Sequence, residues 1–286
     1  MVMSGWAQHA GYRNRCHNPA MPSLTTQKDF RSVQRLPFCY LCGKEFLDGD
    51  QPNKDHIPPQ SIFLKEDREP LWLPTHVACN TGETITDQKI GQLIALKYGK
   101  APKDAAHRRL EITWFPNEQL AALTNLDVDA AVWRWIRGFH AALYRNPLLI
   151  DFTAAAIPGS LVTPFPKAPK GTDQIAIEPL RPQHSAFVQT IKLNRLKQNL
   201  DRISCNKGKL LYECVWNQAD NNGPWMCMFA VNVYDWKDLG STGQHPPRGC
   251  AGFYMLADGS KPEDAAQGVS SPIIIPNLDP LDPFSS

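Results

Sequence analysis

The chain has 286 residues, of which 42% are hydrophobic and 20% charged, with a formal net charge of +2. This length and composition exclude a wholly disordered chain and predict one large or two ordinary domains with a buried core. The 25 prolines exclude a coiled coil, and no apolar run approaches the length of a membrane-spanning helix or a secretory signal core. We therefore expect a soluble, cytoplasmic protein that does not bind membranes.

Charge is distributed unevenly along the chain. Residues 1–35 carry five basic side chains and one acidic one, without any periodicity, which predicts a basic N-terminal arm. Residues 201–286 carry six basic and ten acidic side chains. A polyanionic partner is therefore expected to meet the N-terminal half, although a solvated terminus without an electrostatic role would look the same.

Residues 36–79 consist of short, turn-rich segments and contain two pairs of potential metal ligands. Cys39 and Cys42 form a C-x2-C pair, and His76 and Cys79 form an H-x2-C pair. Zinc prefers four soft or borderline ligands in a tetrahedron, and each tight turn supplies two of them. The spacing predicts a structural Zn²⁺ site; the alternative is that these four side chains are simply buried and reduced.

Later segments show the periodicity of regular elements. Apolar residues at near-helical spacing predict a helix over residues 85–98 and a second one over 127–145, which Asn146-Pro147 ends. Residues 151–175 are Pro-rich and predict a connection. Residues 210–216 and 225–236 are rich in β-formers around a polar turn and predict a β-hairpin.

The residues between and after the two ligand pairs add reactive groups. Asp55 and His56 stand side by side in a D-H-I-P-P segment, and Asn80 directly follows Cys79. The pattern C-x2-C, then D-H-I-x-P, then C-N opening a helix resembles the HNH (ββα-metal) endonucleases, in particular the zinc-stapled branch that includes phage endonuclease VII. The resemblance covers about residues 36–98. It implies a hairpin packed on a helix, with His56 as the general base and Asp55 and Asn80 as ligands of a catalytic Mg²⁺ or Mn²⁺.

These residue types suit phosphodiester hydrolysis, which needs a base for water and a cation for the developing charge. Neighbouring side chains on a regular strand point to opposite faces, so Asp55 and His56 can share one site only if the strand is distorted or one of them acts from its end. A stricter HNH pattern has an Asn near Leu71, and it has a His where Asn80 stands. His76 could alternatively be a catalytic imidazole instead of the fourth zinc ligand.

The sequence thus predicts an α+β protein. Its expected parts are the basic arm (1–35), a zinc-stapled ββα-metal (HNH) module with a helical extension (36–150), the Pro-rich connection (151–175), and a mixed, hairpin-containing C-terminal part without an assigned role (176–286). The expected function is metal-dependent hydrolysis of nucleic acid, with DNA favoured as the partner. The alternative is a catalytically inactive zinc-binding module that binds nucleic acid or protein.

Overall fold

The computed structural model has a mixed α+β architecture. It describes residues 22–63, 65–69, 71–81, 87, 89, 112–115, 120–123, 128–149, 182–218, 223–233 and 249–268. Its largest element is a five-stranded mixed sheet in the order β1-β6-β7-β8-β9, in which only the β1–β6 pair is parallel. These strands are β1 (Ser23–Leu24), β6 (Asp201–Cys205), β7 (Leu210–Gln218), β8 (Trp225–Val233) and β9 (Gly249–Met255).

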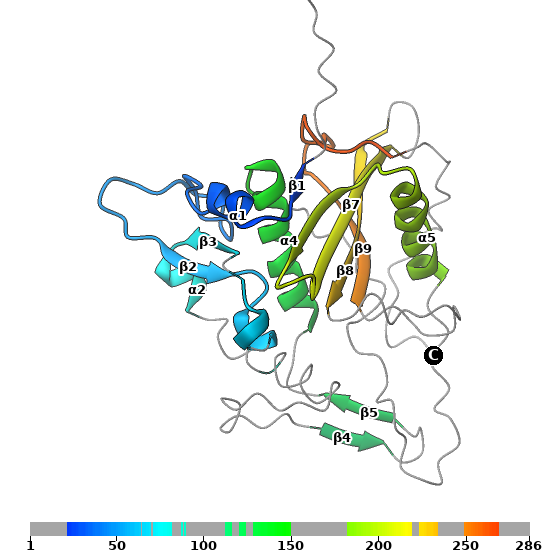
Figure 1. Cartoon of the computed structure of the whole chain (residues 1–286), viewed down its shortest axis with the longest axis horizontal. Helices are drawn as coiled ribbons and strands as arrows, with labels where there is room; N and C mark the ends of the chain where they lie inside the picture. The colour runs from blue at the N-terminus through cyan, green and yellow to red at the C-terminus, as the bar shows by residue number, and fades with distance from the viewer. Residues whose placement is uncertain are drawn as a thin grey trace, which may run out of the picture.

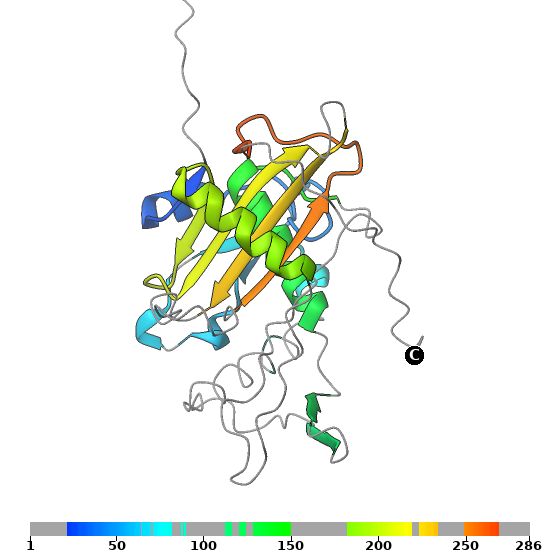
Figure 2. The ribbon, with the colours of Figure 1, turned by 90° about the vertical axis from the view of Figure 1, so that its right-hand side faces the viewer.

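Two helices cover the opposite faces of this sheet, α4 (Val128–Tyr144) and α5 (Pro182–Leu196) (Figures 1 and 2). Successive strand side chains point to opposite faces, so Tyr212 lies in the core cluster on the α4 side and Met228 in the cluster on the α5 side. Both faces are buried, which explains why β7 and β8 are apolar along most of their length and do not alternate with polar residues.

A second, small sheet lies on the other side of α4. It is an antiparallel pair of β2 (Asn53–His56) and β3 (Trp72–Thr75), followed by the short helix α2 (Val77–Asn80). Two 3-10 turns, Gln60–Ile62 and Lys65–Asp67, lie in the loop between the strands. A separate hairpin is formed by β4 (Ile112–Phe115) and β5 (Leu120–Leu123).

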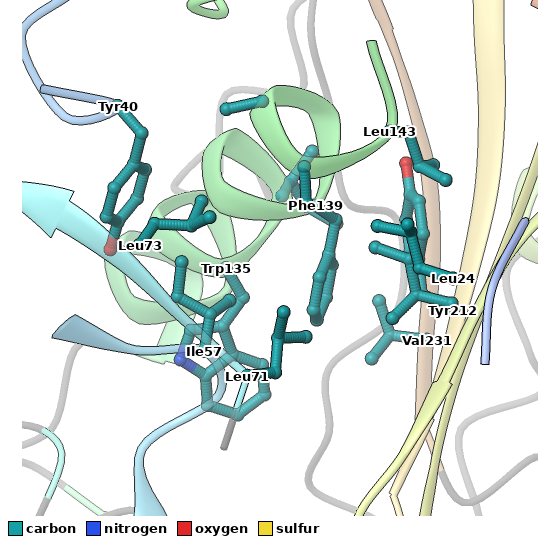
Figure 3. Close-up of a cluster of buried hydrophobic side chains, with 14 of the residues drawn as sticks. Leu24, Tyr40, Ile57, Leu71, Leu73, Trp135, Phe139, Leu143, Tyr212 and Val231 are labelled. Atoms are coloured by element: carbon teal, nitrogen blue, oxygen red, sulfur yellow. The ribbon is translucent and has the colours of Figure 1, made fainter. Parts of the chain in front are cut away.

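One hydrophobic cluster connects the β2–β3 hairpin, α4 and the large sheet (Figure 3). Ile57 and Leu73 approach α4 from the hairpin, Trp135 and Phe139 belong to the helix itself, and Tyr212 approaches from the sheet. Helix α4 is therefore shared between both halves of the structure and is buried almost all round.

A buried polar network also fixes α4 to the sheet. The Tyr144 hydroxyl donates to Asp201 Oδ2 at 2.6 Å and accepts from Trp216 Nε1 at 3.0 Å. The backbone N–H of Ala266 donates to the same Asp201 oxygen at 2.8 Å. Burial raises the pKa of Asp201 to about 6 in spite of these donors, because the protein interior disfavours the charged carboxylate.

The structure confirms the helix predicted over residues 127–145, which is α4, and the predicted hairpin, which is β7–β8. Residues 22–35 differ from the predicted arm. They form β1 and α1 (Gln27–Val33), whose N-terminus carries a capping box between Thr26 and Asp29. Phe30 and Val33 of α1 are fully buried, and this burial orders the segment.

Several predicted features lie largely outside the described residues. The predicted Pro-rich connection, 151–175, is among them, and of the helix predicted over 85–98 only Asp87 and Lys89 are described, both as helical. The division of the chain into domains stays a prediction. Among the described helices, none is both long and apolar enough to cross a membrane.

Candidate metal centre and adjoining polar cluster

The structure brings the four predicted zinc ligands together. The ligand atoms of Cys39, Cys42, His76 and Cys79 all lie within 4.8 Å of one another. The Cys42 sulfur is 3.4 Å from His76 Nδ1, so the imidazole faces the thiols with that nitrogen. Three sulfurs and one imidazole nitrogen are the donor set that a tetrahedral structural Zn²⁺ site uses, and the residues therefore fit this ion.

Local backbone structure accounts for the first ligand pair. The Gly43 N–H donates to the Cys39 carbonyl at 2.8 Å, and the Cys39 N–H donates to the Lys44 carbonyl at 2.9 Å. Gly43 has φ +75°, which is strained for residues with a side chain, and a Cβ there would lie 3.1 Å from Leu149. The glycine after Cys42 thus lets the chain turn back immediately behind its two ligands.

The second pair is set by the end of β3 and the first turn of α2. His76 is the N-cap residue of α2, and the Cys79 N–H donates to the His76 carbonyl at 3.1 Å, so one helical turn places both side chains on the same side. His76 Nε2 lies 3.9 Å from Asp50 Oδ2. A carboxylate near the far nitrogen favours the tautomer protonated there and leaves Nδ1 free to bind metal.

Electrostatics also favour a cation among the three thiols. Partial burial and the neighbouring groups of Cys39 and Cys42 raise the pKa of Cys79 to about 12. Several thiolates this close repel one another unless a positive charge lies between them. A zinc ion at this position would remove that repulsion and link two segments that lie far apart in the sequence.

A second cluster joins Asp55 of β2 to Asn80 of α2 through one arginine of α4. Arg134 Nη2 donates to Asp55 Oδ2 at 2.7 Å and to Asn80 Oδ1 at 2.6 Å. Asp55 is only 5% exposed, and the same carboxylate oxygen accepts a hydrogen bond from the Tyr40 hydroxyl. Two hard oxygen donors from distant parts of the chain therefore meet on one positively charged group, and they fit the ligand preference of Mg²⁺ or Mn²⁺.

The charge of Arg134 is held by its surroundings. Its Nη1 donates to Asp87 Oδ2 at 2.8 Å, which places a second carboxylate beside the guanidinium. Burial alone would lower the pKa of Arg134, but Tyr40, Asp55 and Asp87 raise it, so the guanidinium stays charged. Burial, with the neighbouring charge of Asp55, raises the pKa of Tyr40, which keeps the phenol protonated as a donor.

His56 is the last residue of β2 and faces differently. Asp55 and its cross-strand partner Leu73 are buried toward α4, whereas His56 and its partner Trp72 are half-buried. Strand alternation places Lys54 on the same outer face, and its ammonium lies 4.9 Å from the centre of the Trp72 ring. Burial lowers the pKa of His56, so the imidazole is mainly neutral near pH 7. The structure therefore brings Asp55 and Asn80 together and leaves His56 at the strand end, on the other face.

Arg134, Tyr40 and Asp87 are site residues that were not predicted from the sequence. A signal for Arg134 exists in the sequence, because this charged residue sits between Trp133 and Trp135 in a helix whose other residues are mostly apolar. A charge on such a helix needs a buried counter-charge. The sequence does not reveal which carboxylate supplies it.

Comparisons with known proteins give no assignment: no family model matches the chain, and no significant match is found among curated proteins or among solved structures.

Proposed function

We propose that this protein is a zinc-stapled, divalent-cation-dependent phosphodiesterase of the HNH type that acts on nucleic acid, with DNA favoured. The observation that carries the proposal is the convergence of Asp55 and Asn80 on one cationic group. The two residues come from the strand and the helix that the HNH resemblance names. The Cys39, Cys42, His76 and Cys79 cluster supports it, because these ligands would tie the Cys39–Cys42 turn to the start of α2, which carries Asn80.

In this proposal each residue has one task. His56 takes the proton from the attacking water, a role for which a half-buried, neutral imidazole is suited. Asp55 and Asn80 would hold the Mg²⁺ or Mn²⁺, which when bound supplies charge neutralisation at the phosphate and the leaving oxygen. Tyr40 donates to Asp55 and so orients its carboxylate. His56 lies on the outer face and Asp55 on the inner face of β2. To contact both the His56 imidazole and the cation, the substrate phosphate would therefore have to bind at the end of this strand.

The outer face of the β2–β3 hairpin offers contacts for nucleic acid. Lys54 is exposed and Trp72 is half-buried, and they lie beside His56 on this face. A lysine attracts the phosphate backbone, and an indole ring stacks on bases without sequence preference. Substituting Trp72 by Ala is expected to weaken binding, whereas Lys197→Ala, which alters an exposed lysine just after α5, is expected to leave binding unchanged.

Cleavage assays test the proposal directly. Zinc-loaded protein is incubated with plasmid, single-stranded DNA and RNA, each with and without Mg²⁺ or Mn²⁺, so that zinc is never removed by a chelator. We expect cleavage that requires the added cation and that falls about 10²- to 10⁴-fold in His56→Ala, with the zinc content unchanged. A His56→Ala protein that cuts as fast as the wild type, or a wild type that cuts none of the three substrates with either ion, would contradict the proposal.

One observation favours a second candidate, a zinc-stapled nucleic-acid-binding module without hydrolytic activity. The guanidinium of Arg134 already satisfies the oxygens of both proposed cation ligands. This candidate predicts salt-dependent retention of DNA that Trp72→Ala weakens, with no cleavage under any cation. The same set of assays therefore distinguishes the two functions.

A further inference from the structure

We propose that Arg134 is an internal cation that competes with the divalent metal ion for Asp55 and Asn80. The inference rests on the proposed function in one respect, which is the assignment of the cation to Asp55 and Asn80. It adds a device that the HNH resemblance does not contain: a side chain of this protein fills that position and sets how tightly a metal ion can bind.

The geometry makes the two cations mutually exclusive. One guanidinium nitrogen lies 2.7 Å from Asp55 Oδ2 and 2.6 Å from Asn80 Oδ1. Mg²⁺ binds oxygen ligands at about 2.0–2.1 Å and requires near-octahedral space around itself. A metal ion bound to both oxygens would therefore occupy the place of this nitrogen, and the two positive charges would also repel each other. Arg134 has to leave before the ion can bind.

The surroundings favour the closed arrangement. Arg134 is 7% exposed, and it comes from the middle of α4, between the buried Trp135 and the half-buried Trp133. Its second nitrogen donates to Asp87 at 2.8 Å, so leaving Asp55 and Asn80 also disturbs this ion pair. A buried ion pair that loses one partner leaves an uncompensated charge, which is strongly unfavourable. Arg134 thus neutralises Asp55 without a metal ion, and a metal ion binds only by overcoming this interaction.

Replacing Arg134 should convert the cluster into an open cation site. Arg134→Ala leaves the carboxylates of Asp55 and Asp87 and the amide oxygen of Asn80 without the guanidinium they share. The variant is expected to melt at a lower temperature than the wild type and to recover as MnCl₂ is added, because an ion that binds only the folded state stabilises it. The wild type is expected to show little or no such rise over the same range.

The experiment uses the full, zinc-loaded chain and does not depend on cleavage. Thermal midpoints are measured against MnCl₂ concentration, bound Mn²⁺ is measured by electron paramagnetic resonance, and zinc is quantified in each sample. We expect Arg134→Ala to bind Mn²⁺ at least tenfold more tightly than the wild type. Arg145→Ala is the matched control. Arg145 is an exposed arginine that directly follows the same helix, and it donates hydrogen bonds to Ser32 and not to the Asp55–Asn80 cluster. The control should bind Mn²⁺ as the wild type does.

Two further variants keep the test decisive. Asn80→Ala combined with Arg134→Ala should lose the Mn²⁺ stabilisation, which assigns the ion to this cluster and not to the thiols. If Arg134→Ala does not fold even with Mn²⁺, Arg134→Met with Asp87→Asn removes the guanidinium together with one carboxylate. It should fold and bind Mn²⁺ more tightly than the wild type does.

Equal Mn²⁺ affinity in the wild type and the arginine variants would overturn the inference. It would also be overturned if the stabilisation persists after Asn80 is replaced. A wild type that cleaves DNA but shows equal affinities would refute the inference and leave the proposed function standing. If the protein has no cleavage activity but Arg134→Ala gains Mn²⁺ binding, the proposed function would be refuted and the inference about Arg134 would stand.

Discussion

Gly138 of α4 packs against Ile57, the residue that directly follows β2. A Cβ at Gly138 would lie 2.2 Å from Ile57 Cδ1, 3.0 Å from Ile57 Cγ2 and 3.1 Å from Ile57 Cγ1. Ile57 is 2% exposed and directly follows His56, so it has little room to move. We expect Gly138→Ala to destabilise the protein even though it lies inside a helix.

The magnitude follows from two opposing effects. Replacing a helical glycine by alanine gains about 1 kcal/mol, since the unfolded chain loses freedom and the helix is intrinsically favoured. Forcing an extra carbon into a packed core costs about 1–3 kcal/mol. At 2.2 Å the contact is far inside van der Waals distance and several Ile57 carbons are involved, so the upper part of that range applies. The net expected loss of unfolding free energy is about 1–2 kcal/mol.

A double-mutant cycle measured by urea unfolding tests this reasoning. Ile57→Val alone should cost about 0.5–1.5 kcal/mol. Valine lacks the Cδ1 atom that the new Cβ meets at 2.2 Å, so Gly138→Ala should be nearly neutral in that background, with a coupling of at least about 1 kcal/mol. A Gly138→Ala protein that is more stable than the wild type, or strict additivity of the two changes, would refute the close contact.

Three other outcomes are expected. Cys79→Ser should yield protein with well under one zinc per chain by elemental analysis and a lower melting temperature, since structural zinc contributes folding free energy; full zinc occupancy would exclude it as a ligand. Asp50→Asn should weaken zinc affinity about 10- to 100-fold in chelator competition, because it removes the carboxylate near His76 Nε2; an unchanged affinity would show that this contact does not orient the ring. Because the pKa of Asp201 is raised from 3.8 to about 6, the folded chain holds this proton more tightly than the unfolded chain. This tighter proton binding stabilises the folded chain by roughly 3 kcal/mol, and the stabilisation is fully present below about pH 4 and is lost as the pH rises through about 6. Unfolding free energies measured from pH 4 to 7 should show this fall relative to Asp201→Asn, and parallel curves for the two proteins would contradict it.

The features that the sequence predicts are those with local patterns. Val132, Trp135, Ile136 and Phe139 recur at helical spacing, and all four are buried in α4. The two ligand pairs are also local patterns, because each turn fixes the spacing of its own two ligands. The four-ligand site then requires only that the two turns meet. The β7–β8 hairpin likewise pairs segments that are close together in the sequence.

The features that it does not predict depend on distant residues. β1 has two residues and pairs with β6, with Ser23 opposite Arg202, and no local pattern marks so short a parallel contact. The ion pair of Asp55 with Arg134 spans 79 positions and depends on the packing of α4 against the hairpin. Strand alternation predicts that His56 and Asp55 point to opposite faces of β2. The sequence alone does not show whether a distortion of the strand would bring the two side chains together.

The shared helix α4 also determines how the protein can be dissected. A fragment that ends before residue 128 would keep every proposed zinc ligand, yet it would expose Ile57 and Leu73 to water, and Asp55 would lose Arg134. A fragment that keeps α4 but stops before β6 would leave Tyr144 without Asp201 and Phe139 without Tyr212. Neither piece is therefore expected to behave as an independent folding unit. Limited proteolysis would be expected to release no stable fragment in which the hairpin and the large sheet are separated.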